Sequence, residues 1–237
     1  PPVPGYLRGA ALAVAGAGAP NPPPGLVTGA VEPHVFGQLF LFYNRVPPET
    51  LLFWGRIAGL PLFAVLLIAL RLWGGVFALA FAAFDPNLIA HFSLATTDGA
   101  LAAFFLASLA LWEISPAAAG AVAGLALATK PTAMMLPLIF LFAGRARPRS
   151  VLISWAAFAA VAVLCYVPTG VGGLVSTLAV RSKQMGSPAP TYLFGAIHPH
   201  GHPFYFPLIL LIKTPVPLLL LGAWGLWDKR LWKGVED

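Results

Sequence analysis

The stretch "HFSLATTDGALAAFFL", residues 91–106, places one carboxylate, Asp98, at the start of a long apolar run. The fifteen residues from Gly99 to Glu113 carry no charge before the last of them. A run of this length that opens on Thr and Asp is typical of a helix whose polar residues lie in its first turn. The stretch therefore predicts a helix at about 97–112 and raises the question of what the acid at its start does.

The composition of the whole chain indicates that this helix belongs to a membrane protein. Of the 237 residues, 59% are hydrophobic and 9% are charged, whereas soluble domains carry about 25% charged residues. The apolar runs have helical length, which excludes the short alternating strands of an outer-membrane barrel. The single cysteine, Cys165, excludes a disulfide framework. We therefore expect an all-α fold, a polytopic transmembrane helical bundle.

Seven apolar segments predict about seven spans. The fourth and fifth cover only about 21 Å each, less than the roughly 30 Å hydrocarbon core. They predict a broken pair that meets at "ATKPT", where Pro131 ends one helix and starts the next; a single long bent helix is the alternative. The segments are 51–73, 75–90, 97–112, 116–129, 131–144, 151–167 and 204–227.

Two stretches are too polar to span a bilayer and set the domain boundaries. We expect an outer loop at 1–50, membrane helices at 51–167, a second outer loop at 168–203, and a last helix with a cytoplasmic end at 204–237. The chain begins "PPVPGYLRG", without an initiator Met or a signal-peptide pattern. We expect that a first membrane helix precedes this point and is missing.

The positive charges predict the topology. Counting seven spans by parity puts one set of seven cations on a single side, which the positive-inside rule makes cytoplasmic. Both long loops, Asp85, His91 and Asp98 then face outward. This cytoplasmic set is Arg71, Arg145, Arg147, Arg149, Lys229, Arg230 and Lys233.

The remaining cations are predicted on the outer side, where the rule disfavours them. Lys213 lies about nine residues into the last predicted span, where a lysine costs about 2.5–3.5 kcal/mol. Snorkelling to the headgroups is one explanation, and a buried anion such as a lipid phosphate is the other. Lys130 and Arg56, at the outer ends of other spans, favour the anion. The outer set is Arg8, Arg45, Arg56, Lys130, Arg181, Lys183 and Lys213.

The outer acids and histidines each allow a structural and a functional interpretation. Asp98 either caps its helix or faces the outer cations, where it would orient a substrate hydroxyl or a metal. Asp85 in "FDPN" likewise fits a turn. The alternating histidines of "HPHGH" either hold a divalent metal or form a structural, headgroup-contacting loop. They are His198, His200 and His202.

Three longer stretches resemble a known family. They are "DPNLIAHFSLATTDGALAAFFLASLAL" (85–111), "AGLALATKPTAMMLPLIFLF" (123–142) and "PTYLFGAIHPHGHPFYFPLILLIKTPVPLLLL" (190–221). Together they resemble the bacterial branch of the protein O-mannosyltransferase and aminoarabinose-transferase family, glycosyltransferase family 39, which has a type-C membrane fold. "FGQLFLFYNRVPPETLLFWGRIAGL" (36–60) looks like the family's lead-in to its second membrane helix, and the resemblance runs to Trp227.

The resemblance implies an inverting transfer of a sugar from a polyprenyl-phosphate carrier to an acceptor hydroxyl on a protein or glycolipid. It would occur at the outer face of a bacterial inner membrane. Asp98 matches the family's second acidic motif as the catalytic candidate. Lys130 matches its Thr-Lys and Lys213 its Lys-Thr-Pro, so both would contact phosphate. Arg56 and His91 complete the substrate-binding set, and no cofactor is implied beyond the metal alternative.

The chain departs from the family pattern in its first segment. The family carries an Asp-Glu pair after its first helix, with an acid there as general base, but no acid precedes Glu32 here. The alternatives are therefore an inactive relative that serves as a structural subunit of a larger membrane complex, or a transporter of lipid-linked sugars. A transporter should show repeated broken helices, whereas the sequence indicates one broken pair. We expect a membrane-embedded glycosyltransferase with no nucleic-acid partner.

The predicted topology is testable by cysteine labelling. In a Cys165→Ala background, a membrane-impermeant thiol reagent added from outside should label His200→Cys and leave Arg147→Cys unlabelled until the membrane is permeabilised. The opposite labelling pattern would overturn the assignment of the outer face, and with it the outer-face site.

Overall fold

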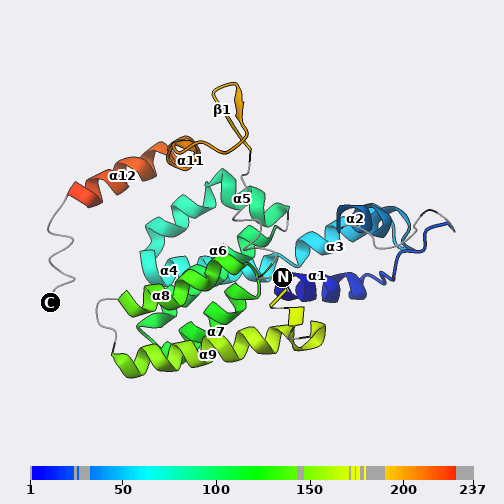
Figure 1. The fold of residues 1–237 in the computed structure, drawn as a ribbon, viewed down its shortest axis with the longest axis horizontal. Helices are drawn as coiled ribbons and strands as arrows, with labels where there is room; N and C mark the ends of the chain where they lie inside the picture. Colours follow the sequence, from blue (N-terminus) through cyan, green and yellow to red (C-terminus); the bar gives the residue numbers. More distant parts are fainter. Residues whose placement is uncertain are drawn as a thin grey trace. The chain divides into compact units, whose positions relative to one another are not determined.

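The computed structural model describes residues 2–23, 26, 33–94, 96–142, 147–170, 172–173, 175–176, 179 and 190–227. The chain divides into two units, Pro1–Val175 and Ser176–Asp237. The described residues are nearly all helical, which confirms the expected all-α membrane architecture (Figure 1). Arg145, Arg181, Lys183 and the predicted cytoplasmic cations after Trp227 lie outside the described residues.

The first unit contains nine α-helices and two short 3₁₀ helices among its described residues. They are α1 (Pro2–Val14), α2 (Pro33–Phe42), α3 (Pro48–Ile57), α4 (Leu60–Ala83), α5 (Pro86–Ser93), α6 (Thr97–Trp112), α7 (Pro116–Leu127), η1 (Pro131–Met134), α8 (Met135–Phe142), α9 (Pro148–Tyr166) and η2 (Val167–Thr169). The second unit contains β1 (Thr191–Leu193), β2 (Ala196–His198), α11 (Tyr205–Lys213) and α12 (Val216–Trp227).

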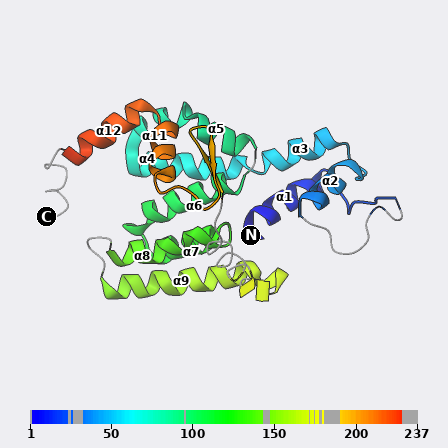
Figure 2. The ribbon, with the colours of Figure 1, turned by 45° about the horizontal axis from the view of Figure 1, so that its top comes forward.

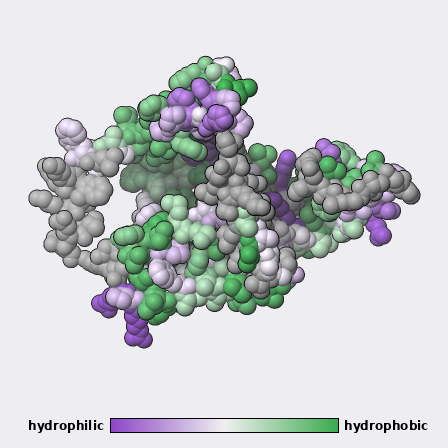
Figure 3. Space-filling view, in the orientation of Figure 1, coloured by the Kyte–Doolittle hydropathy of each residue, from purple (hydrophilic) through white to green (hydrophobic). Residues whose placement is uncertain are grey.

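The surface of the helices suits a lipid environment. Within the described ranges, two helical segments are long and apolar enough to cross a membrane, Pro48–Ala83 and α9. Two sharply bent pairs, α5 with α6 and α11 with α12, raise the number to four if each pair is one span. Hydrophobic residues cover much of the visible face (Figure 3), and large apolar side chains such as Phe142 and Leu152 are exposed.

Helix breaks explain why fewer full spans are found than the seven apolar segments suggested. Gly75 adopts φ 68° and ψ −161° inside α4, at the boundary predicted between the first two segments. Lys130 is extended, with φ −155° and ψ 132°, because the residue before a proline is disfavoured in the helical region. The predicted break at "ATKPT" is thereby confirmed, and Pro131 begins the following 3₁₀ turn.

The last predicted segment is wrong in one respect, because it is not a continuous helix. Thr214 precedes Pro215 and adopts an extended conformation, φ −84° and ψ 127°, for the same steric reason. The helices on either side are bent by 112°. Lys213 is therefore the last residue of α11, where a cation complements the helix dipole, and it lies directly before the break between the two helices. The expectation of a single broken pair is wrong for the same reason.

Parts of the two predicted outer loops are ordered structure. Residues 2–14 and 33–42 form α1 and α2 inside the segment expected as a loop. Good helix formers account for α1, since Leu and Ala dominate after its opening prolines. In the second loop, β1 and β2 pair antiparallel around Phe194 and Gly195, which both have positive φ, the geometry of a tight hairpin turn.

The core of the first unit is a close contact between α7 and its neighbours. Helix α7 packs against α6 and α9, and it runs beside α9 in both ribbon views (Figures 1 and 2). A Cβ on Gly120 would overlap the backbone carbonyl of Ser154, and one on Gly124 would lie 2.7 Å from the carbonyl oxygen of Phe158. Small residues spaced four apart let membrane helices approach closely, and this spacing is the sequence signal for the contact.

The close approach predicts a specific sensitivity. Gly120→Ala should lower the free energy of unfolding by about 1–3 kcal/mol, because the added methyl group overpacks the α7–α9 contact. Thermal unfolding in detergent or nanodiscs measures the loss. Gly55→Ala in α3 is the matched control, since a Cβ there meets nothing within 4 Å. Equal stability of the two variants would contradict the packing.

Candidate functional site

The site around Asp98 is formed by an antiparallel helical hairpin. Helix α6 turns into α7 through Glu113–Ser115, and the Ser108 hydroxyl donates to the Ala119 carbonyl at 2.9 Å near that turn. At the opposite end of the hairpin, the start of α6 therefore meets the end of α7. This geometry brings Asp98 to Lys130 across 32 residues of sequence.

Asp98 and Lys130 form an ion pair, with 2.5 Å between Lys130 Nζ and Asp98 Oδ1. Their side chains are 45% and 33% exposed, respectively, so the pair remains open to a ligand. The acid lies in the first turn of α6, and the cation follows the C-terminus of α7. Each charge thus complements the dipole of its own helix. The structure brings Asp98 to Lys130, one of the cations predicted on the outer side; the side of the membrane that they face stays a prediction.

The capping interpretation holds for one acid and not for the other. Asp85 is the N-cap of α5, and its Oδ1 accepts from the Leu88 backbone N–H at 2.8 Å. The N-cap of α6 is Thr96, whose side chain accepts no capping hydrogen bond, while Asp98 lies inside the first turn. Asp98 therefore does not cap its helix, and the structure gives it the ion pair instead.

His91 and Thr96 close the turn between α5 and α6. His91 Nδ1 lies 2.8 Å from Thr96 Oγ1, and Thr96 Oγ1 lies 3.3 Å from the His91 carbonyl oxygen, to which it donates. A hydroxyl has one proton, so Thr96 can donate to the His91 carbonyl or to Nδ1 but not to both. When Nδ1 carries the proton, Nδ1–H donates to Thr96 and the hydroxyl donates to the carbonyl, so both contacts form together.

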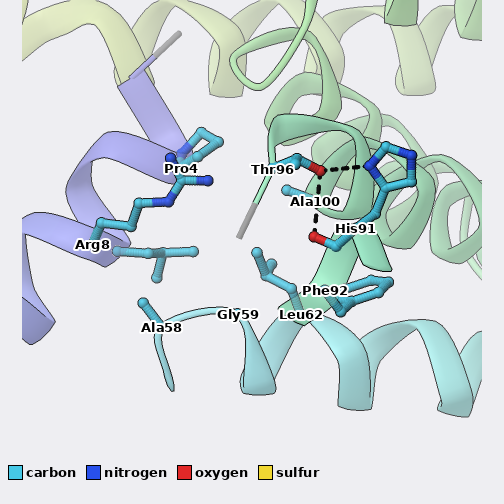
Figure 4. A pocket seen from close by; sticks show the side chains of 10 residues that line it. Pro4, Arg8, Ala58, Gly59, Leu62, His91, Phe92, Thr96 and Ala100 are labelled. Carbon is cyan, nitrogen blue, oxygen red and sulfur yellow. Dashed lines mark hydrogen bonds between the residues drawn. The ribbon is translucent and has the colours of Figure 1, made fainter. Parts of the chain in front are cut away.

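A pocket lies between α1 and this turn (Figure 4). Arg8 of α1 lies on one side of it, and His91 and Thr96 lie on the other (Figure 4). Burial lowers the pKa of the partly buried Arg8 guanidinium below its usual value. The pocket therefore has a partly buried cation on one side and, on the other, polar groups that adjoin the start of α6. Its lining is Pro4, Leu7, Arg8, Ala58, Gly59, Leu62, His91, Phe92, Thr96 and Ala100.

Two other predicted site residues, Arg56 and Lys213, do not take part in the ion pair. Arg56 is exposed in the last turn of α3, close in sequence to the pocket residues Ala58 and Gly59 but not part of the Asp98–Lys130 pair. Lys213 is exposed at the end of α11, in the second unit. Its contribution to a phosphate site stays a prediction.

The histidine loop forms no three-ligand group in the part of the chain that the structure describes. The rings of His198 and His202 lie 4.8 Å apart between centroids, and His202 Nδ1 accepts from the Phe204 backbone N–H at 3.3 Å. Among the described residues, no three His, Cys, Asp or Glu side chains cluster as metal ligands. The metal alternative for His200 and its neighbours, and for Asp98, thus gains no geometric support there.

Arg8 and Thr96 are polar residues of the pocket that were not predicted as site residues from the sequence. Arg8 belonged to the outward cations, yet its segment was expected to be a loop, so nothing placed it near His91. Thr96 adjoins Asp98, but the hydrogen bond to His91 depends on the tight turn between α5 and α6. The available signal for Arg8 was its position in a run of good helix formers, residues 2–14.

A comparison with known families covers most of the chain. A family model described as glycosyltransferase family 87 matches residues 33–234. No curated protein and no solved structure matches the chain. The match confirms the broader expectation of a membrane glycosyltransferase with a lipid-linked sugar donor. It names a family other than the O-mannosyltransferase branch that the motifs resemble, and it leaves α1 outside the matched range.

The coupling free energy between Asp98 and Lys130 distinguishes an open ligand site from a buried ion pair that only stabilises the fold. A double-mutant cycle with Asp98→Asn, Lys130→Gln and the double variant, measured by unfolding, should give a coupling of about 0.2–1 kcal/mol, because partly exposed pairs are weak. A coupling of about 3 kcal/mol, the upper end for residues in direct contact, would contradict an open site.

Proposed function

The chain belongs to glycosyltransferase family 87, and we propose that it transfers a sugar from a polyprenyl-phosphate carrier to an acceptor hydroxyl, with inversion, at the outer face of a bacterial plasma membrane. The observation that supports this site most directly is the Asp98–Lys130 pair. It presents a carboxylate and an ammonium side by side, in reach of solvent, between the ends of two helices. These are the two groups that the transfer requires.

The carboxylate serves the acceptor. Lys130 occupies Oδ1 of Asp98, and the second oxygen is the one we assign to the acceptor hydroxyl. By accepting the hydrogen bond of that hydroxyl, Asp98 orients its oxygen towards the anomeric carbon and draws the proton away as the new C–O bond forms. The bond between the anomeric carbon and the phosphate oxygen breaks on the opposite face.

The cation serves the leaving group. The electron pair of the breaking bond stays on the polyprenyl phosphate, whose negative charge increases. An ammonium has three donors, so Lys130 keeps two for phosphate oxygens after its bond to Asp98. A cation already held in place stabilises the developing charge without reorganisation. Arg56 is proposed as a further phosphate ligand, and His91 as a substrate-binding residue. For Lys213, in the second unit, contact with a phosphate stays the prediction made from the sequence.

The family membership supports a transferase over the two alternatives. The additional helix break at Thr214–Pro215 removes one argument against a transporter, but the matched model describes glycosyltransferases. The resemblance to the O-mannosyltransferase branch makes mannose, with a protein or glycolipid acceptor, the first substrate pair to test.

Substitution of the acid tests this role. With the protein in proteoliposomes and a panel of polyprenyl-phosphate sugars that includes mannose, Asp98→Asn should lower the transfer rate by about 10²–10⁴-fold, as loss of an acid-base group does. The near-isosteric amide should leave the folded yield unchanged. Lys130→Gln should also lower the rate, because the charge that develops on the leaving phosphate loses its cation.

The matched control is Asp85→Asn on the neighbouring helix. Asn is as good an N-cap as Asp, so this variant should keep wild-type activity. If Asp98→Asn transfers sugar as fast as Asp85→Asn does, the assignment of Asp98 to the acceptor is wrong.

A further inference from the structure

The hairpin of β1 and β2 displays apolar side chains although it lies outside the helices. Tyr192 and Ile197 are paired across the two strands and are 67% and 71% exposed, and Phe194 at the turn is 80% exposed. Residues directly opposite each other in an antiparallel pair share one face of the sheet, so Tyr192 and Ile197 form an apolar face beside the turn. The solvated face of an antiparallel sheet is normally polar. We call Tyr192, Phe194 and Ile197 the apolar tip.

The turn residue Phe194 has an unfavourable backbone conformation. Its φ is 52° and the φ of Gly195 is 84°; a two-residue turn with positive φ at both positions favours Asn-Gly. A bulky side chain at positive φ is strained. Within the described ranges, Phe194 is the one residue other than glycine with positive φ. The hairpin thus carries an exposed aromatic ring at a strained position, which indicates a partner outside the hairpin.

The sequence around the hairpin lacks the charges of a loop that is surrounded by water. No Asp, Glu, Lys or Arg occurs at residues 184–212, whereas exposed edge strands of soluble proteins are commonly protected by charged side chains. The nearby polar side chain of His198 lies at the end of β2 away from the turn, and His200 follows it. A hairpin without fixed charges and with an aromatic tip is suited to the membrane–water interface, where aromatic residues are enriched.

The chain keeps the hairpin close to the bilayer. Helix α11 begins at Tyr205, only six residues after β2 ends (Figure 1). It is apolar, and Phe206 and Ile212 are exposed on it, as expected of a helix in contact with lipid. Six extended residues reach about 20 Å, and a turn shortens this linker, because the Gly201 N–H donates to the His198 carbonyl at 3.1 Å.

We propose that the β1–β2 hairpin inserts its apolar tip into the surface of the lipid bilayer. The insertion is shallow, at the boundary between headgroups and acyl chains. A two-stranded sheet has open edges, and their unpaired backbone N–H and C=O groups cannot be buried in the hydrocarbon core. Tyr192 suits this depth, because its ring is apolar and its hydroxyl can bind water or headgroups. The inference depends on the chain being embedded in a membrane, and it does not rest on sugar transfer.

Spin-label accessibility tests the insertion. In the full chain with Cys165→Ala, a nitroxide is attached to Ile197→Cys with Phe194 kept, and the protein is placed in nanodiscs of phosphatidylethanolamine and phosphatidylglycerol. Molecular oxygen concentrates in lipid and a nickel chelate in water, so the ratio of their collision rates with the label reports its depth. The ratio should be higher at Ile197→Cys than at His200→Cys, the matched site in the linker, which should face water.

Substitution of the turn residue tests whether the phenylalanine ring holds the hairpin in lipid. Phe194→Asn removes the ring and introduces a residue that tolerates positive φ, so the Tm should stay at the wild-type value or rise. The oxygen-to-nickel ratio at Ile197→Cys should nevertheless fall to the value at His200→Cys. Phe84→Asn, which removes a similarly exposed phenylalanine after the end of α4, is the control and should leave the ratio unchanged.

Three results would overturn the proposal. A preference of the Ile197→Cys label for the nickel chelate would place the hairpin in water. Low collision rates with both reagents would show that protein covers the tip, either another part of this chain or a second copy. An unchanged ratio in Phe194→Asn would show that the ring does not hold the hairpin in lipid. None of these results alters the transfer rates expected for Asp98→Asn.

Discussion

The approach of α7 to α9 at Gly120 and Gly124 is the constraint on which the site depends. Because no side chain separates the backbones there, α7 is held at one depth against α9, and the hairpin with α6 follows it. The end of α7 then lies where the start of α6 can reach it. Asp98 and Lys130 meet as a consequence of helix packing, without any local sequence relation between them.

The same geometry explains how charged groups persist in so apolar a chain. Asp98 lies at a helix start and Lys130 beyond a helix end, so each is stabilised by backbone dipoles before any ligand binds. Their partial exposure limits the cost of desolvation.

Several structural features that depend on neighbouring residues in the sequence were predicted correctly. The bounds of α6 and the break at Lys130 follow from an apolar run and from Pro131, and both were found. The kink at Gly75 fell on a predicted boundary. Lys213 was predicted inside a continuous helix, because the segment around it is almost entirely apolar. Pro215 disfavours the helical conformation at Thr214, and the helix therefore ends at Lys213. The pocket could not be predicted, because it brings Arg8 close to residues more than eighty positions away in the sequence. That contact depends on the packing of α1, which lies in a segment that was expected to be a loop.

The central claim is that the Asp98–Lys130 pair is the point where the polyprenyl phosphate is held for sugar transfer. An experimental structure of the protein in a lipid nanodisc, with decaprenyl phosphate bound, tests it most directly. The account predicts phosphate oxygens within hydrogen-bond distance of Lys130 Nζ, with the Asp98 carboxylate beside them on the side open to an acceptor. Phosphate bound away from Lys130, with the ion pair closed and covered by protein, would contradict it.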